Sequence, residues 1–292
     1  MLISKLIEEQ QEKTSIDRSL IEQDYAISWL LYGFSKTQEL RPHLVLKGGT
    51  CLRKCYFDDY NRFSQDIDFS VIGDYPNDDE LNDLIRTACQ FTEESLQRRG
   101  HDVSVVAIPI IINNLKNFLV SFRYPWEKEY IPKITIELSF PKGTYFSICE
   151  REITPPYNEP LHALIKTYSL EEIVCDKISE LLDFSRKIDE GKWVRHRGRD
   201  YYDLAMNYYD LWHILHKEPF KLDKKAIPDA TKVKCLEKSI LFESIDDLFN
   251  ETLMKDVDTF WKIWIKQFVP DSPPPKKQIL QEVRESLKEV FR

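Results

Sequence analysis

The sequence predicts an α+β fold, with strands concentrated in the first half of the chain and helices in the second. An apolar run over residues 43–46 indicates a buried strand, and residues 133–140 alternate apolar and polar side chains in the manner of a half-buried strand. From about Leu161 onward, apolar residues recur at helical spacing. Two consecutive prolines at positions 155–156 mark a boundary. We therefore expect one domain over residues 1–156 and a helical domain over residues 157–292 that contributes to the active-site cleft.

The composition is that of a globular protein. Of its 292 residues, 42% are hydrophobic and 31% are charged, which argues against disorder. No apolar stretch approaches the roughly 18 residues that a membrane-spanning helix needs, and the first residues lack the apolar core of a signal peptide. We expect a cytoplasmic protein without a membrane partner. None of its six cysteines forms a CxxC pair, and without a secretion signal we expect them to be reduced.

Net charge limits the ways in which this protein can bind nucleic acid. The formal charge is −8 at pH 7, so the chain does not coat nucleic acid by bulk electrostatic attraction. Any contact with RNA or DNA must use a local basic patch.

The remaining elements follow from periodicity and turn residues. Apolar spacing predicts helix over residues 1–36, and Asn77 or Asp78 is a suitable N-cap for a helix over residues 79–98. The β-branched run 101–112 and residues 118–124 predict a hairpin, in which Pro109 favours an edge strand or a bulge.

A glycine turn and an acidic pair follow the first strand. Gly48 and Gly49 end that strand and precede a helix over residues 50–57, and a backbone without Cβ atoms can lie close to a phosphate. Asp66 and Asp68 lie in the next strand, where the period of two places both on one face. Ser64 shares that face if the strand begins so early. One side of this unit can hold phosphates, and the other can hold a divalent ion.

Glu137 is a single carboxylate on the polar face of the alternating strand 133–140. If this strand lies beside the one that carries Asp66 and Asp68, Glu137 completes a cluster of three carboxylates. The alternative is a solvated charge at the edge of a sheet.

Two further candidates lie in the helical half. Lys177 falls on the apolar stripe of a helix over residues 170–188, where a lysine either extends to solvent or meets an anion; we favour an anion and expect a triphosphate. Asp200 and Asp203 lie in the first turn of the next helix, where acids complement the helix dipole. Asp200 also shares a face with apolar residues and is therefore the better candidate for an inward position.

A basic loop separates those two helices. It ends in Arg195, Arg197 and Arg199, which are suited to contact a phosphate backbone, such as that of RNA, or a triphosphate. A solvated loop is the alternative.

These motifs together resemble a known family. The blocks LKGGTCL, RFSQDIDFS, EEIVCDKISELL and RDYYDL, with EQDYAISWLL near the N-terminus, resemble the AbiEii-type nucleotidyltransferase toxins of type IV toxin–antitoxin systems, to which the MenT toxins belong. The resemblance implies a DNA polymerase beta-like nucleotidyltransferase core with a mixed sheet and a helical C-terminal domain.

The resemblance also implies roles for individual residues. Gly48, Gly49 and Thr50 would grip the triphosphate, Asp66 and Asp68 would bind Mg²⁺, and Lys177 and Asp200 would complete the catalytic site. Arg62 and Ser64 occupy the family's positions before the Asp-x-Asp strand and would contact the nucleotide. Glu137 stands where many relatives have Asp, as a third candidate metal ligand.

The function implied by the resemblance is transfer of a nucleoside monophosphate from an NTP to RNA. The leading acceptor is the 3′ end of tRNA, with a block of translation as the consequence and a cognate antitoxin as partner. One alternative is a small-molecule nucleotidyltransferase of the antibiotic-modifying kind on the same core. Another is a catalytically silent module that binds nucleotide or RNA.

Overall fold

The computed structural model describes residues 2–57, 62–74, 77–112, 115–126, 131–154, 157, 159–190, 198–216, 222–269 and 273–292, with the backbone alone at residues 112, 115–116, 189 and 198–202. The chain forms two compact units, Met1–Tyr168 and Ser169–Arg292. Each is described by itself.

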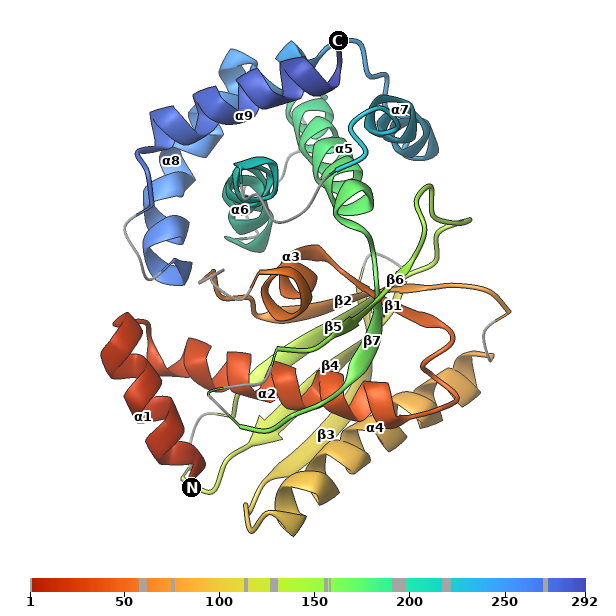
Figure 1. Ribbon diagram of the computed structural model, residues 1–292, viewed down its shortest axis with the longest axis vertical. Helices are drawn as coiled ribbons and strands as arrows, with labels where there is room; N and C mark the ends of the chain where they lie inside the picture. The colour runs from red at the N-terminus through yellow and green to blue at the C-terminus, as the bar shows by residue number, and fades with distance from the viewer. Residues whose placement is uncertain are drawn as a thin grey trace. The chain divides into compact units, whose positions relative to one another are not determined.

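A mixed β-sheet is the centre of the first unit (Figure 1). Among the described residues it has seven strands in the order β3-β4-β5-β2-β1-β7-β6. Strand β2 runs parallel to β5 and antiparallel to β1, and β1 runs parallel to β7. The strands are β1 (Leu44–Lys47), β2 (Asp66–Val71), β3 (Ser104–Ile112), β4 (Leu115–Arg123), β5 (Lys133–Ser139), β6 (Cys149–Glu152) and β7 (Leu164–Thr167).

Helices pack around this sheet. They are α1 (Ile3–Thr14), α2 (Arg18–Lys36), α3 (Gly48–Cys51), which continues into the π-helix η1 (Leu52–Tyr56), and α4 (Asp78–Arg98). The predicted N-terminal helix is interrupted at Ser15, which adopts the left-handed conformation, and α2 restarts with the Asp17 side chain as its N-cap. Asn77 caps α4 as expected, since its side chain accepts hydrogen bonds from two backbone N–H groups.

The hairpin prediction is confirmed. Strands β3 and β4 pair antiparallel along their whole length, and β3, which contains Pro109, lies at the edge of the sheet, where proline is tolerated. The proposed turn at residues 113–114 lies outside the described residues.

One secondary-structure prediction is wrong. The chain is not helical from Leu161, because residues 164–167 form β7 between β1 and β6. A strand of four residues has too little pattern to be recognised in sequence; the backbone of β1 stabilises it, and Tyr168 N–H donates to the Leu46 carbonyl at 2.9 Å. The first unit consequently extends to Tyr168, beyond the boundary expected after residue 156.

The second unit is helical in all the elements described. These are α5 (Leu170–Asp189), α6 (Gly198–His216), α7 (Ile227–Glu237), the 3₁₀ helix η3 (Ile245–Phe249), α8 (Glu251–Phe268) and α9 (Lys276–Val290). Helix α6 is the inner element of this unit, and it packs against α5, α8 and α9.

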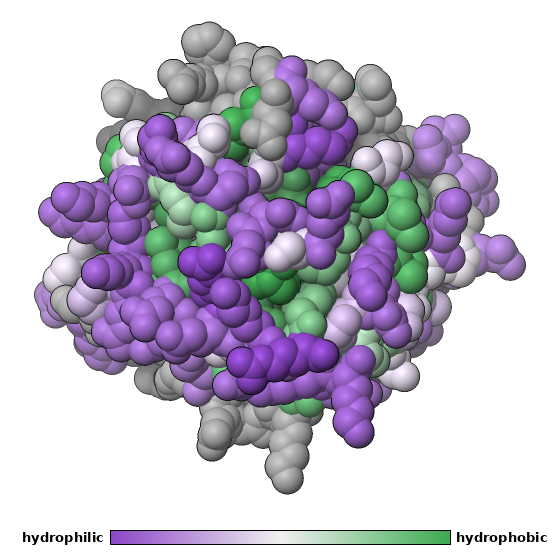
Figure 2. Space-filling model, turned by 90° about the horizontal axis from the view of Figure 1, so that it is seen from above, coloured by the Kyte–Doolittle hydropathy of each residue, from purple (hydrophilic) through white to green (hydrophobic). Residues whose placement is uncertain are grey.

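The face of the molecule drawn in Figure 2 is mostly hydrophilic, as the high share of charged residues predicts, and hydrophobic residues appear between polar ones. None of the described helices is both long enough and apolar enough to cross a membrane.

Candidate active site

Strand β2 presents two carboxylates on one face of the sheet. Phe69 is fully buried and packs its ring against Phe34 of α2, with ring centroids 5.2 Å apart. Because side chains alternate along a strand, Asp66 and Asp68 point to the opposite face, where both are half-buried. The predicted placement of this pair is confirmed.

Glu137 lies beside the pair. Strands β2 and β5 are parallel neighbours, with Asp68 in register with Glu137 and Asp66 in register with Thr135. Adjacent strands are about 4.8 Å apart, so the carboxylates of Asp68 and Glu137 project from neighbouring backbone positions on one face. Among the residues that the structure describes, no three His, Cys, Asp or Glu side chains converge closely enough to hold a metal ion. A metal role for Glu137 therefore stays a prediction.

The turn at Gly48 lies directly against Asp68. Gly48 has φ +71°, and a Cβ atom added there would lie 2.6 Å from Asp68 Oδ2. Any other residue would clash with the carboxylate and strain the backbone. The helix begins at Gly48 itself, two residues before the predicted start at Thr50. The turn and the Asp-x-Asp strand thus form one packed unit.

Two hydroxyl groups donate hydrogen bonds to Asp66. Thr50 Oγ1, which is fully buried, donates to the Asp66 carbonyl at 2.5 Å, and Ser64 Oγ donates to Asp66 Oδ1 at 3.2 Å. Ser64 reaches the carboxylate from a position before the strand, which begins at Asp66. The Thr50 hydroxyl holds the strand against the turn; its contact with a triphosphate stays a prediction.

Arg62 adds positive charge to the turn. It is 4% exposed, and a Cβ atom added at Gly49 would lie 2.5 Å from its Nη1 atom. The same Nη1 donates to the Phe63 carbonyl at 3.2 Å. The guanidinium therefore covers the backbone of the glycine turn, where positive charge favours a phosphate.

Lys177 of α5 meets an anion within the second unit. Its Nζ atom lies 2.5 Å from Asp210 Oδ2 and donates to Asn207 Oδ1 at 3.0 Å. Lys177 is buried, and the anion beside it in the described part of the chain is the Asp210 carboxylate of α6. A contact between Lys177 and a triphosphate stays a prediction. Sequence analysis did not single out Asp210. The signal was available, because Asp203, Asn207 and Asp210 recur at helical spacing on an otherwise apolar helix.

Several predicted site residues lie partly or wholly outside the described residues. The helix predicted after the basic loop is confirmed as α6, and it includes Arg199 and Asp200, whose side chains lie outside the described part of the chain. Arg195 and Arg197 lie outside it altogether. Their roles stay predictions.

Helix α2 contributes a buried carboxylate that was not among the residues predicted from the sequence. Asp24 is 2% exposed, and its carboxylate accepts a hydrogen bond from Arg53 Nε at 2.6 Å. Arg53 follows the glycine turn by four residues. The sequence signal was three consecutive polar residues, Glu22-Gln23-Asp24, inside an apolar helix, all of which are buried.

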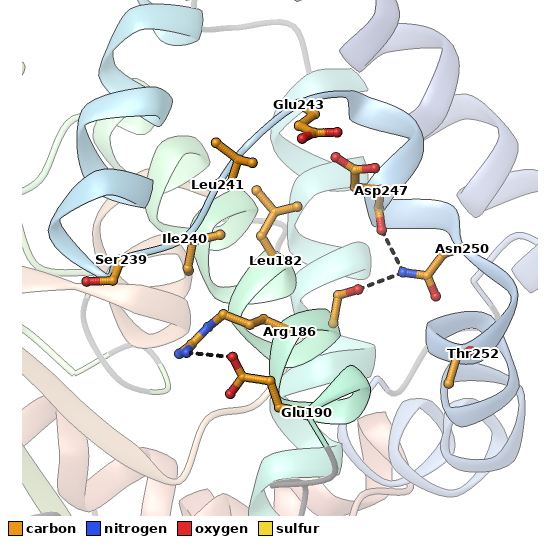
Figure 3. Close-up of a pocket in the computed structure, with 11 residues that line it drawn as sticks. Leu182, Arg186, Glu190, Ser239, Ile240, Leu241, Glu243, Asp247, Asn250 and Thr252 are labelled. Carbon is orange, nitrogen blue, oxygen red and sulfur yellow. Dashed lines mark hydrogen bonds and ion pairs between the residues drawn. The ribbon is translucent and has the colours of Figure 1, made fainter.

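A separate cavity of about 610 Å³ lies within the second unit (Figure 3). Arg186 of α5 projects toward it and pairs with Glu190, while Leu182, Ile240 and Asp247 line other sides. The described residues that line this cavity include none that was predicted for catalysis, and we assign the cavity no role in nucleotide transfer.

The fold and the site together define a nucleotidyltransferase: a glycine turn packed on an Asp-x-Asp strand, with a third carboxylate in register on the neighbouring strand. A family model described as "Nucleotidyl transferase AbiEii toxin, Type IV TA system" matches residues 29–289. The chain belongs to this family of nucleotidyltransferase toxins. Its function therefore involves a nucleotide substrate and an antitoxin partner.

Structural comparison agrees with this assignment at the level of the fold. The nucleotidyltransferase toxin MenT4 from Mycobacterium tuberculosis matches with a TM-score of 0.55 and 18% identity, over 94% of each chain. An antigenic nucleotidyltransferase-like protein from Paracoccidioides brasiliensis matches with a TM-score of 0.36 and 11% identity, over 90% of this chain and 93% of that one. Comparison with curated protein sequences gives no match.

Proposed function

We propose that this protein transfers a nucleoside monophosphate from an NTP to RNA, with the 3′ end of tRNA as acceptor, and thereby blocks translation. The observation that supports the chemistry is the register of Asp68 and Glu137 on neighbouring strands, with Gly48 packed against Asp68. Membership of a toxin family supports the biological outcome. The proposal places the protein in the cytoplasm, where tRNA and NTPs are found.

The donor atoms of this site suit Mg²⁺. Asp66 and Asp68 offer carboxylate oxygens on one half-buried face, which are the ligands that this hard cation prefers. Because Gly48 has no Cβ atom, the backbone of the turn can lie directly against the Asp68 carboxylate. Asp66 and Asp68 would hold the ion, with Glu137 beside them. When bound, Mg²⁺ neutralises triphosphate charge and lowers the pKa of the attacking hydroxyl.

The residues of the chain then position the reaction. A hydroxyl oxygen of the RNA forms a bond to the α-phosphorus of the NTP, and the bond from that phosphorus to the bridging oxygen of the β-phosphate breaks, so pyrophosphate leaves. Ser64 orients the Asp66 carboxylate through its hydrogen bond. Arg62, held against Gly49, offsets the negative charge that develops on the phosphates.

Asp68→Asn tests this function. The substitution keeps the shape of the side chain and removes its charge, so nucleotide transfer should fall at least about a hundredfold, because even groups that only orient metal ligands are worth 10–100-fold. The assay combines purified protein, Mg²⁺, total tRNA and each labelled NTP in turn. Asp74→Asn is the matched control, since Asp74 is an exposed carboxylate shortly after the same strand, and it should transfer as the wild type does. Undiminished transfer by Asp68→Asn would contradict the proposal.

The acceptor is tested in the same experiment. Aminoglycosides replace tRNA in a parallel reaction, and label on the small molecule but not on tRNA would identify an antibiotic-modifying enzyme instead. Relief of growth inhibition by a co-expressed neighbouring gene would identify the antitoxin.

A further inference from the structure

A buried ionic cluster lies next to the glycine turn. Asp24 of α2 is 2% exposed, and its carboxylate accepts hydrogen bonds from Arg53 Nε at 2.6 Å and Arg53 Nη2 at 3.2 Å. Lys54 Nζ lies 2.8 Å from Asp24 Oδ1, and the Tyr157 hydroxyl donates to Asp24 Oδ2 at 2.9 Å. The cluster joins α2 to η1, the helical segment that continues from the turn.

A buried ionic cluster of this kind adds little net stability to a fold. Burial favours the neutral acid, yet the charges of Arg53 and Lys54 keep the pKa of Asp24 well below its ordinary value. Burial also lowers the pKa of Lys54 to about 8, although Asp24 opposes this shift. Removing charges from water costs about as much as their attraction returns, and apolar residues of similar volume are often at least as stable. A buried cluster of this kind can instead fix one particular geometry.

The geometry fixed is that of the segment before Asp66. Arg53 Nη1 donates to the Arg62 carbonyl at 3.4 Å, and the Arg53 guanidinium carbon lies 4.1 Å from the centroid of the Phe63 ring. The next residue, Ser64, donates to the Asp66 carboxylate. Arg53 lies in the helical segment that starts at the glycine turn, and it therefore links that segment to the residues just before the Asp-x-Asp strand.

We propose that Asp24 is a positioning residue for nucleotidyl transfer. By orienting Arg53, it fixes the spacing between the turn at Gly48 and the strand that carries Asp66 and Asp68. Asp24 does not itself touch the nucleotide, the metal or the acceptor. The inference rests on the proposed function of this site and extends the catalytic apparatus to α2.

The test compares two buried carboxylates on the same helix. Asp24→Asn removes the charge that orients Arg53. Glu22→Gln is the matched control, because Glu22 is 5% exposed and binds Arg18 Nε at 2.8 Å and Trp126 Nε1 at 3.0 Å, away from the turn. Thermal unfolding reports the structural cost of each variant, and steady-state kinetics with tRNA and NTP report the chemistry.

We expect kcat of Asp24→Asn to fall about 10–100-fold, the range for groups that orient a site without touching the substrate. Affinity for a fluorescent, non-hydrolysable Mg·NTP should weaken in the same variant, while KM for tRNA stays unchanged. Glu22→Gln should keep wild-type kinetics whatever stability it loses. The single variant Arg53→Gln and the double variant Asp24→Asn/Arg53→Gln complete a mutant cycle. The kcat of the double variant should be no lower than that of the slower of the two single variants, because both substitutions break the same contact between Asp24 and Arg53.

A second variant covers a failure of Asp24→Asn to fold. Arg53→Lys keeps a positive charge beside Asp24 but loses the planar fork that reaches the Arg62 carbonyl and covers Phe63, so its kcat should fall in the same way. Equal kinetics for Asp24→Asn and Glu22→Gln, or multiplying effects in the double variant, would overturn the proposal. If the wild type transfers nothing to RNA, the proposed function fails, and Mg·NTP affinity alone decides the role of Asp24: a loss confined to Asp24→Asn and Arg53→Lys supports it, and unchanged affinity overturns it.

Discussion

Gly48 shows how a single residue joins the glycine turn to the Asp-x-Asp strand. Its positive φ and the 2.6 Å approach of a Cβ atom to Asp68 Oδ2 are independent reasons for glycine at this position. The first is a property of the turn, and the second exists only because β1 and β2 pair in the observed register.

Gly48→Ala separates these two reasons when it is compared with Gly73→Ala. Gly73 has φ +70° and nothing within 4 Å of an added Cβ atom. The free energy of unfolding of Gly73→Ala should therefore fall only by the cost of placing alanine in the left-handed conformation, roughly 1–2 kcal/mol. Gly48→Ala should be destabilised further and should lose nucleotide transfer, because Asp68 must move. Urea unfolding and the transfer assay measure the two effects. Equal stability and activity in the two variants would show that the contact with Asp68 is unimportant.

At the scale of elements, α5 and α6 are joined by a buried polar contact. The side chains of Lys177 and Asp210 are 5% and 0% exposed, and Asn207 links Lys177 to Glu180 through its amide. The presence of such a buried pair is weak evidence for net stability, but removing one partner leaves a buried charge and is strongly destabilising. It also means that loss of Lys177 has a structural cost that must be separated from any catalytic one.

Lys177→Met should destabilise the protein by about 3–5 kcal/mol, because it leaves the Asp210 charge buried without its lysine. The double variant Lys177→Met/Asp210→Leu should recover much of that stability, as measured by urea unfolding. If Lys177 also serves the nucleotide, as the family resemblance implies, the double variant folds but still fails in the transfer assay. Recovery of transfer together with stability would show that Lys177 acts through the fold alone.

At the scale of the whole molecule, most of the thiols are buried. None of the six cysteines, all of which the structure describes, forms a disulfide, and five of them are buried. Burial raises the pKa of Cys89 to about 12 and that of Cys235 to about 11, from an ordinary value of about 9. These thiols stay protonated in the folded protein at pH values where the unfolded chain loses their protons.

Stability should therefore decline at alkaline pH. The unfolded state binds fewer protons than the native state above pH 9, so the contribution of each buried thiol is complete below that pH and is lost as the pH rises toward the folded pKa. The measurement is urea unfolding in reductant from pH 8 to 11. Cys89→Ala is the control and should show a shallower decline than the wild type. Identical slopes would exclude Cys89 as a contributor.

The sequence by itself determined the components of the site and most of the elements that carry them. Glycines, paired aspartates and strand periodicity are local properties, so the turn, the Asp-x-Asp strand and the face of Glu137 followed from residue types and spacing. The long amphipathic helices α4 and α5 followed for the same reason. Short strands such as β7 did not, because four residues have too little periodicity and depend on a partner strand for their hydrogen bonds.

Only the tertiary structure decided which groups meet. Register placed Glu137 beside Asp68, and packing between segments distant in sequence brought Asp24 to Arg53 and Asp210 to Lys177. In sequence, each of these residues is one polar side chain in an amphipathic pattern, and that pattern states which face it occupies but not its partner. Burial makes the partner decisive, because a charge removed from water must be paired where it lies.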